Sequence, residues 1–515
     1  KLWKTAFSKD KSDTSIIKAF LRGNLSKKLT RTLSKYLSEV KYPVAIRSSS
    51  LLEDSQYQPL AGMYSTYMLP NSDTSKTIRL EQLKKAIKLV YASTYLKEPK
   101  SLIENSVHHH EEEKMAVIIM ELVGKEHASL FYPSASGSAQ SFNYYPVSYM
   151  KREEGVAHLA LGLGRTIAEG EKSLRFSPKY PGIIPQYYSI RSTIDNSQNQ
   201  FYALDLKRAS RLLKDGKQEN TSSFELSVAE QDGELHWSGS VITEADNVLR
   251  DSLRHTGTRV ITFPSFLKWE TAPIPDILID VLKMGENALG CPIEIEFAIN
   301  MHRNNEKENE FCLLQIKPMV IGGIERVQNF DSINKDDLFC KSSVALGNGL
   351  IDNIQNIVIV DPTTFDASQT EIIAKDIEHI NNKMAEGENF ILIGPGRWGS
   401  ADPWLGVPVE WDQISNAKVI IEFGMENFPV DPSFGSHFFQ NVTSMRIGYF
   451  TLNHKKKKDY LDLNWLNDQK VMAVTKYTKW IRLERPLSVT IDGETGDGSI
   501  IKPLAPLKEI MDEHE

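Results

Sequence analysis

Cysteine is scarce in this chain, which has only Cys291, Cys312 and Cys340 among its 515 residues. The number is odd, and no two of them have the spacing of a metal-binding pair. A disulfide framework and a redox role are therefore not expected. Three buried or partly buried free thiols in a reducing, cytoplasmic setting fit the sequence better.

Long apolar segments are also lacking. The most apolar run, residues 115–120, is ended by Glu121 and is far shorter than the roughly 20 residues that cross a bilayer as a helix. No signal-peptide pattern opens the chain. We therefore expect no membrane partner. Because the chain begins with Lys1 rather than Met, we expect it to be a piece of a longer protein.

Positive charge is not in excess either. Lys and Arg total 60 against 67 Asp and Glu, so the formal net charge is −7. A mildly acidic chain gives no reason to expect nucleic acid or an anionic membrane as a partner. Hydrophobic residues make up 41% of the chain, as in an ordinary soluble globular protein. At roughly 100–200 residues per domain, the length predicts about two to four folding units.

Apolar periodicity predicts the main elements of the first part of the chain. Polar residues 192–200 and 214–222 are predicted to be loops. The last two predicted strands are joined by a polar stretch and form a hairpin with a long loop. We expect helices within residues 12–40, 80–98 and 276–289, and strands at residues 44–46, 115–123, 129–132, 293–299 and 311–316.

A domain boundary is expected near residues 322–335, after Pro318 and the pair Gly322-Gly323. Beyond it, apolar strands and one helix alternate as β-α-β, which is typical of an α/β domain. The end of the chain is predicted to be β-rich. The strands are expected at 357–360 and 390–393, the helix at 369–385 and the β-rich part at 469–503. The two domains would then span residues 1–325 and 326–515.

The predicted hairpin carries an unusual set of polar residues. Glu294 and Glu296 are two residues apart on a strand, so they point to the same face. Gln315 and Lys317 lie on the returning strand. Two carboxylates are costly to bury unless something positive lies between them, and Mg²⁺ prefers carboxylate and phosphate ligands. The alternative is an ordinary solvent face, which strand alternation alone favours.

A second segment with chemistry follows the strand at residues 44–46. Arg47 is expected to leave that strand and enter a loop of small residues, Ser48-Ser49-Ser50. Such a loop offers N–H groups and hydroxyls to phosphate, and arginine supplies a planar fork of donors. The alternative is a capping turn in which Ser48 or Ser49 starts a helix.

Several segments together resemble the N-terminal ATP-binding domain of the phosphoenolpyruvate synthase and pyruvate phosphate dikinase family. They occur in family order over residues 12–320, and this order makes the resemblance specific although each motif alone is weak. The resemblance favours the ligand role of Glu296 and Gln315 over the solvent face. The segments are Tyr42 to Tyr67, Tyr91-Ala92-Ser93, Met115 to Tyr132, Gly162-Leu163-Gly164, Glu294-Ile295-Glu296-Phe297 and Leu314-Gln315-Ile316-Lys317-Pro318.

The resemblance implies an α+β fold, a two-lobed ATP-grasp nucleotide-binding domain, followed here by a smaller α/β domain. It implies Mg²⁺ and ATP as cofactors and phosphoryl transfer to an acceptor histidine. That histidine would lie on another domain of the native chain or on a partner chain, and so would the pyruvate-binding site. Arg47 would contact the phosphates and act in catalysis. The residues implied in nucleotide binding are Arg47, Ser48, Gly62, Glu294, Gln315 and Lys317, and those implied as metal ligands are Glu296 and Gln315.

Three departures from the family pattern stand in this sequence. The family's early Gly-Gly-Lys segment would lie before Lys1, so it is expected to be missing with the native N-terminus. Lys317 replaces an arginine, which exchanges a planar fork for a point charge. Arg165 follows Gly162-Leu163-Gly164, where an acidic residue is common.

The second predicted domain has two candidate sites. His437, within Pro432 to Phe439, is the nearest counterpart of the family's phosphorylated histidine; the alternative is a structural histidine in an aromatic turn. The segment Gly394 to Ser400 follows a strand and could bind phosphate, or it could be a tight turn in which Trp398 and Trp404 pack together.

Three functions remain open from the sequence. The first is a phosphotransferase module that passes phosphoryl groups from Mg·ATP to a histidine. The second is a non-catalytic nucleotide-sensing module. A complete ligase that forms an acyl phosphate would need a pocket for a carboxylate substrate, and the sequence offers no candidate for one.

Overall fold

The computed structural model divides into two compact units. The first comprises Lys1–Met319 with Gly435–His437, and the second comprises Val320–Phe434 with Phe438–Glu515. No helix among the residues described is long and apolar enough to cross a membrane. The structure describes residues 2–8, 11–53, 62–104, 113–144, 146, 150–207, 221–303, 307–319, 334–347, 349–385, 387–400, 402, 404–425, 428, 436–445, 447–453, 458–492 and 495–503.

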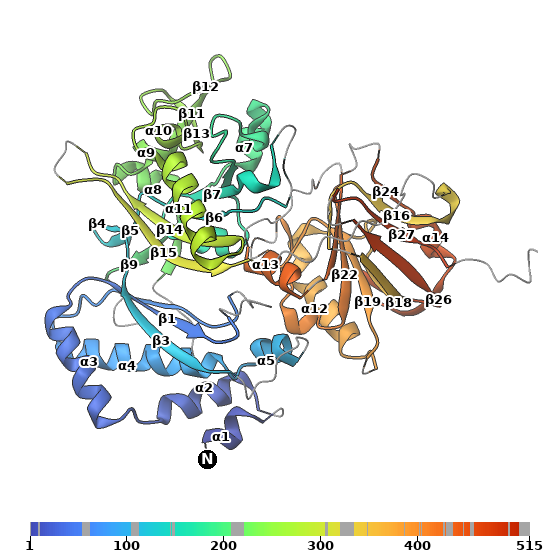
Figure 1. Cartoon of the computed structure of the whole chain (residues 1–515), viewed down its shortest axis with the longest axis horizontal. Helices are drawn as coiled ribbons and strands as arrows, with labels where there is room; N and C mark the ends of the chain where they lie inside the picture. The colour runs from blue at the N-terminus through green and yellow to red at the C-terminus, as the bar shows by residue number, and fades with distance from the viewer. Residues whose placement is uncertain are drawn as a thin grey trace, which may run out of the picture. The chain divides into compact units, whose positions relative to one another are not determined.

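The first unit opens with helices packed on a small antiparallel sheet of order β2-β1-β3 (Figure 1). Leu33, Ile46, Leu83 and Val90 are buried together in the core between them. Helix α4 lies on the sheet, and α2 and α3 pack against α4. Amphipathic spacing explains α2 and α3, because their apolar residues recur on one face. The elements are α1 (Leu2–Ala6), α2 (Asp13–Arg22), α3 (Lys27–Glu39), β1 (Val44–Ser50), β2 (Tyr67–Leu69), α4 (Lys76–Ser93), α5 (Lys97–Glu104) and β3 (Met115–Glu121).

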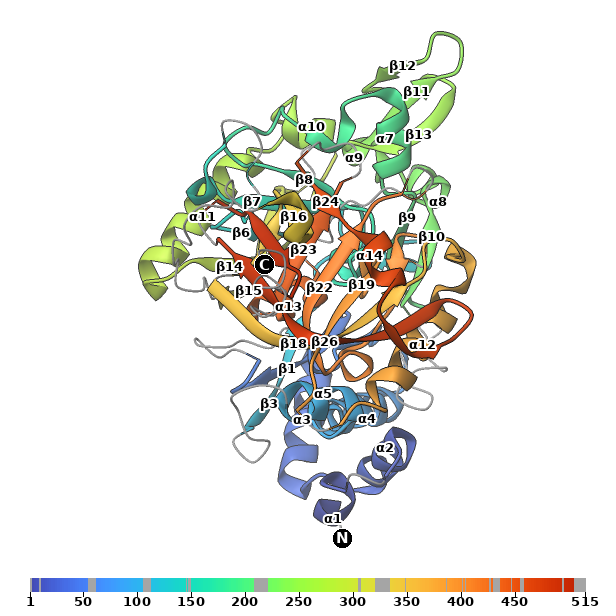
Figure 2. The same ribbon diagram turned by 90° about the vertical axis from the view of Figure 1, so that its right-hand side faces the viewer.

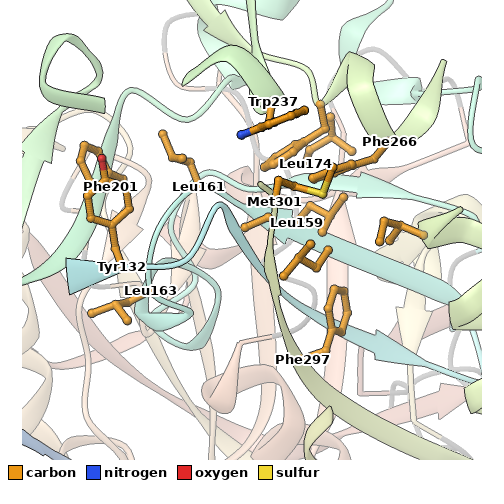
Figure 3. Close-up of a cluster of buried hydrophobic side chains, with 14 of the residues drawn as sticks. Tyr132, Leu159, Leu161, Leu163, Leu174, Phe201, Trp237, Phe266, Phe297 and Met301 are labelled. Atoms are coloured by element: carbon orange, nitrogen blue, oxygen red, sulfur yellow. The ribbon is translucent and has the colours of Figure 1, made fainter. Parts of the chain in front are cut away.

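The rest of the first unit contains three further sheets, with strand orders β10-β9-β5-β4, β15-β14-β6-β7-β8 and β12-β11-β13. The main core of the unit lies here, and Figure 3 shows Leu159, Phe297 and Met301 among its side chains. The strands are β4 (Lys125–His127), β5 (Leu130–Tyr132), β6 (Ala135–Gln140), β7 (Val156–Ala160), β8 (Leu174–Phe176), β9 (Gln200–Asp205), β10 (Thr221–Glu225), β11 (Gly239–Thr243), β12 (Val248–Arg250), β13 (Gly257–Ile261), β14 (Ile293–Asn300) and β15 (Glu310–Pro318). The α-helices are α6 (Arg165–Ala168), α7 (Ile190–Asn196), α8 (Leu226–Gln231), α9 (Leu235–Ser238), α10 (Pro264–Leu267) and α11 (Ile274–Leu289).

Two local expectations were wrong in this unit. Residues 192–200 are not a loop, because α7 covers Ile190–Asn196 and β9 begins at Gln200. A reciprocal cap starts α7: the N–H of Ser192 donates to Oγ of Ser189 at 3.1 Å, and the N–H of Ser189 donates to Oγ of Ser192 at 2.9 Å. This capping box stabilises a polar helix that apolar periodicity does not reveal. Most of the other predicted loop, residues 214–220, lies outside the described residues.

The second error concerns the chain after Arg47. It does not enter a loop there, because β1 continues to Ser50 and pairs with β3 as far as Met115. Ser48 and Ser49 are thus strand residues and do not cap a helix. The ladder to β3 satisfies the backbone groups of these small residues, which explains why the strand persists through them.

The second unit is built on one mixed sheet, which Figure 2 shows with β19 and β22 side by side. β18 (Gly349–Val360), β19 (Phe390–Pro395), β22 (Ala417–Phe423) and β23 (Gly448–Leu452) are parallel neighbours. The predicted β-α-β unit is confirmed, because α12 (Thr370–Asn381) joins the parallel strands β18 and β19.

Apart from β20 and β21, which pair with each other in a separate two-stranded parallel sheet, the remaining strands of the second unit extend its main sheet in antiparallel pairs. The predicted β-rich end is also confirmed, since β25, β26 and β27 pair there. The remaining elements are β16 (Leu338–Ser342), β17 (Ala345–Leu346), β20 (Arg397–Trp398), β21 (Gly406–Val407), α13 (His437–Ser444), β24 (Tyr460–Leu461), α14 (Leu463–Asn467), β25 (Lys470–Val474), β26 (Thr478–Ile491) and β27 (Gly498–Ile501).

Candidate functional site

The hairpin of β14 and β15 places four polar side chains on one face of its sheet. Glu294 lies opposite Lys317, and Glu296 lies opposite Gln315. A β-bulge directly after Glu296 shifts the register, so it terminates this run of aligned pairs. The alternate residues of β14, among them Ile295, are buried in the core on the other face. The expectation of a shared face is therefore confirmed.

These residues do not form a solvent face. Glu294 and Lys317 are each only 6% exposed. Burying charged groups is costly unless they are paired, so the set needs internal compensation. Glu296 remains about a quarter exposed at its side chain, and Gln315 is also only partly buried, so solvent still reaches this end of the set.

Arg47 of β1 meets the hairpin directly. One nitrogen of its guanidinium, Nη2, donates to Oε2 of Glu296 at 2.9 Å and to Oε1 of Gln315 at 2.6 Å. Arg47 precedes these partners by 249 and 268 residues in the chain. The fold thus brings together the two motifs singled out in the sequence.

Glu296 is held ionised by two cations. Burial raises the pKa of its carboxyl, but Lys317 and then Arg47 outweigh burial and lower the pKa to about 2. Nζ of Lys317 lies 3.6 Å from Oε1 of Glu296. Burial lowers the pKa of Lys317, yet Glu296 and Glu294 together raise it above its ordinary value. The three side chains therefore form a charged group in which the carboxylate lies between two positive partners.

Glu294 differs from Glu296 although both lie on the same strand face. Burial raises the pKa of Glu294 to about 7, and Lys317 and Gln140 only partly oppose the rise. Nε2 of Gln140, from β6, donates to Oε2 of Glu294 at 3.1 Å. Two neighbouring carboxyl groups thus have pKa values set far apart by their surroundings, as is frequent in functional sites.

The donor set at Glu296 and Gln315 fits a hard divalent cation. A carboxylate oxygen of Glu296 and the amide oxygen of Gln315 both accept from one nitrogen of Arg47. The guanidinium of Arg47 thus lies where a bound cation would contact both oxygens. No group of three or more His, Cys, Asp or Glu side chains that could hold a metal occurs in the described part of the chain. Mg²⁺ is usually bound by one or two carboxylates together with substrate phosphates, so Glu296, with Gln315 beside it, is the residue that could hold the ion here.

Comparison with known proteins agrees with this geometry. A family model described as pyruvate phosphate dikinase, AMP/ATP-binding domain, matches residues 6–337, which is more than half of the chain. The chain belongs to this family. The resemblance seen in the sequence is confirmed, and residues 6–337 are an AMP/ATP-binding module of the phosphoenolpyruvate synthase and pyruvate phosphate dikinase type. No curated protein matches the chain.

Two other residues that the family resemblance implied have defined surroundings. Oγ of Ser48 donates to Oε2 of Glu53 at 2.8 Å, so its proton is used within the protein and only its lone pairs remain for a ligand. Gly62 has φ of +64°, a conformation that favours glycine.

His437 belongs to the first compact unit, and its imidazole ring lies against Gly62. A Cβ atom at Gly62 would come within 2.0 Å of Nδ1 of His437, so only glycine leaves room for the imidazole. Burial, and then Lys317 and Arg47, lower the pKa of His437 to about 4, although Glu296 acts in the opposite direction. The imidazole is therefore neutral at physiological pH.

The segment Gly394 to Ser400 begins within β19 and continues through β20, and the chain bends between the two strands at Gly396. Gly396 and Gly399 have φ of +72° and +68°, which agrees with the turn interpretation. Trp398 is fully buried, whereas Trp404 is 66% exposed. Pro432 to Gly435 lies outside the described residues.

Sequence reasoning missed a polar row that runs across the sheet from the hairpin. Glu296 lies opposite Ser138 of β6, Ser138 lies opposite His158 of β7, and His158 lies opposite Arg175 of β8. The signal was present in Ser136-Gly137-Ser138-Ala139-Gln140, where polar residues alternate with small ones as in a strand with one polar face. It passed unnoticed because serine and glycine are equally common in loops.

Proposed function

We propose that the first unit binds Mg·ATP in the manner of an ATP-grasp domain and is the nucleotide-binding part of a phosphotransferase. The observation that carries this proposal is the contact of Arg47 with both Glu296 and Gln315. It joins two family motifs in one charged group that suits phosphate and its cation. An ATP-grasp domain holds the nucleotide between two α+β lobes, and β1 and the β14–β15 hairpin would be the facing elements here.

Each residue then has a distinct role in binding. Arg47 and Lys317 neutralise phosphate charge, as positioning and electrostatic stabilisation dominate phosphoryl transfer. Glu296 and Gln315 hold Mg²⁺, whose chemistry is to neutralise the phosphate oxygens. For this, Arg47 exchanges its contacts with these two residues for contacts with phosphate. Glu294 lies beside this centre and orients the nucleotide. The backbone of Gly62 and the lone pairs of the Ser48 hydroxyl make further contacts with the nucleotide.

The acceptor in this proposal is a histidine. His437 is the candidate within this chain because a neutral imidazole carries a lone pair that can attack phosphorus. One ring nitrogen would form a bond to phosphorus while the bond from phosphorus to the leaving oxygen of the nucleotide breaks. The nucleotide leaves with the bonding electrons, and the protein carries a phosphohistidine. A histidine on another domain or chain would receive the group in the same way.

Labelled ATP tests the transfer. Incubation of the parent with Mg²⁺ and ATP, labelled at the β- or γ-phosphorus in separate reactions, should leave acid-labile, base-stable label on the protein. His437→Asn should abolish it, and His379→Asn, at an exposed position of α12, should not. Label in His437→Asn equal to the parent would move the acceptor to another residue. Nucleotide binding without any labelled protein or partner would favour the nucleotide sensor instead.

A further inference from the structure

Strand β6 carries three polar side chains on the face that it shares with Glu296. Two of them are paired within the protein. Oγ of Ser136 donates to the carbonyl oxygen of Gly162 at 2.7 Å, and Nε2 of Gln140 donates to Glu294. The hydroxyl of Ser138, between them, has no hydrogen-bond partner in the part of the chain that the structure describes. Ser138 is nevertheless only 5% exposed.

The position of Ser138 links it to the candidate site. It is the direct cross-strand neighbour of Glu296, which in turn lies opposite Gln315. Directly opposed residues on one face of an antiparallel pair have Cβ atoms about 4.5–5.5 Å apart. The hydroxyl of Ser138 therefore lies within reach of a group bound at Glu296.

The unpaired hydroxyl is unfavourable for the fold alone. A buried donor without a partner loses its hydrogen bonds to water and gains none in return. Alanine would avoid this loss, and the same strand already has alanine at Ala135 and Ala139, both fully buried. A ligand that accepts a hydrogen bond from Ser138 would explain why a hydroxyl stands here.

We propose that Ser138 is a further ligand-binding residue, whose hydroxyl donates to a phosphate oxygen of the nucleotide bound at Glu296 and Gln315. The inference rests on the proposed function and adds a contact to it. Ser138 lies between His158 on one side and Glu296 on the other. Phosphate is the acceptor that the position favours, because Glu296 and the next residue across the sheet, Gln315, are those assigned to the metal and the phosphates. A serine hydroxyl supplies one donor for such an oxygen.

The test is calorimetric titration with Mg²⁺ and a non-hydrolysable ATP analogue, together with melting curves without nucleotide. Ser138→Ala should weaken analogue binding about 5- to 10-fold, which is the usual net value of one hydrogen bond. Its melting temperature without nucleotide should be equal to or above that of the parent. Ser499→Ala is the matched control, since Ser499 of β27 in the second unit is also buried with no partner among the described residues. It should leave the affinity unchanged.

The outcomes separate the two proposals. If the parent binds the analogue and Ser138→Ala binds it equally well, Ser138 is not a ligand residue and the proposed function stands. If Ser138→Ala loses affinity but also melts well below the parent, its hydroxyl is structural and the inference is wrong. If the parent does not bind the analogue at all, the proposed function fails and the inference fails with it.

Discussion

The charge balance of the site depends on the carboxylate of Glu296. It accepts from Arg47, lies near Lys317 and has its pKa lowered to about 2. Removing its charge would leave two cations facing each other with less compensation. The same change would remove an oxygen assigned to Mg²⁺. Binding and stability should therefore both respond to it.

Glu296→Gln keeps the shape and removes the charge. We expect affinity for Mg·ATP to fall at least about 10-fold and the free energy of unfolding without ligand to fall by about 1–2 kcal/mol. Calorimetric titration and denaturant unfolding measure the two effects. Glu230→Gln, which removes an ion pair with Arg259 elsewhere in the unit, should leave affinity unchanged. Unchanged affinity in Glu296→Gln would contradict the metal role.

The ion pair of Glu230 and Arg259 makes a prediction about pH. Hydrogen bonds from Arg259 at 3.0 and 2.6 Å lower the pKa of Glu230 below its ordinary value. A lowered folded-state pKa contributes stability above the unfolded pKa of about 4.3, and the contribution is lost as pH falls through the folded pKa. Because Glu230 is about a third exposed, screening limits the contribution to about 0.5–1 kcal/mol.

Melting curves of the parent and Glu230→Gln across pH check this. The parent should be the more stable at pH 7, and the difference should disappear as the solution is made strongly acidic. A difference that stays constant as the pH falls would mean that the glutamate contributes by packing and not by charge.

At the residue scale, the sequence predicted which side chains lie on one strand face better than it predicted which distant residues they contact. The spacing of Glu294 and Glu296 predicted their shared face, and the structure agrees. The partner of Arg47 lies 249 residues away, so no local pattern could reveal it, and only the family order of motifs related the two. Ser138 escaped notice because its significance depends on which strand lies beside β6.

At the scale of elements, the sequence predicted where the strands near the site lie in the chain, but it did not predict their ends or irregularities. Apolar periodicity located β14 and β15, but the bulge after Glu296 depends on how the two strands pair, which a single strand does not encode. Likewise β1 extends through Ser50 because β3 lies beside it. The helix α7 was missed because a local cap, and not an apolar face, stabilises it.

At Gly137, strand β6 lies in close contact with its neighbouring strands β14 and β7. A Cβ atom there would come within 2.1 Å of Cζ of Phe297 and 2.6 Å of the carbonyl oxygen of His158. Gly137→Ala should therefore lower the free energy of unfolding by about 1–3 kcal/mol through overpacking. Denaturant unfolding measures the loss.

Gly182→Ala is the control for this prediction, because nothing lies within 4 Å of a Cβ atom at Gly182. We expect its effect to stay within about 0.5 kcal/mol. Equal losses in the two variants would show that flexibility of the backbone, and not the lack of space at Gly137, determines the result.

At the scale of the whole molecule, the described residues form two units with separate cores. Leu159 belongs to the main core of the first unit, and Ile391 belongs to that of the second. The family match ends at residue 337, close to the start of the second unit. A domain boundary near residue 325 remains a prediction from the sequence. The sequence predicted the β-α-β unit of β18, α12 and β19 but not β16 and β17, which precede it, and it offered no way to order the antiparallel strands.

Separate cores predict separate unfolding, and only one transition should respond to nucleotide. A ligand that binds a folded unit stabilises it by about 2.7 kcal/mol at 100 times its dissociation constant. Scanning calorimetry with Mg²⁺ and a non-hydrolysable ATP analogue should therefore shift one of two transitions upward. Truncation of a buried Leu or Ile to alanine costs about 2–5 kcal/mol, so Leu159→Ala should lower the transition that shifts and Ile391→Ala the other. If Ile391→Ala lowered the nucleotide-sensitive transition as strongly as Leu159→Ala does, the two units would unfold as one, and the assignment of binding to the first unit alone would be wrong.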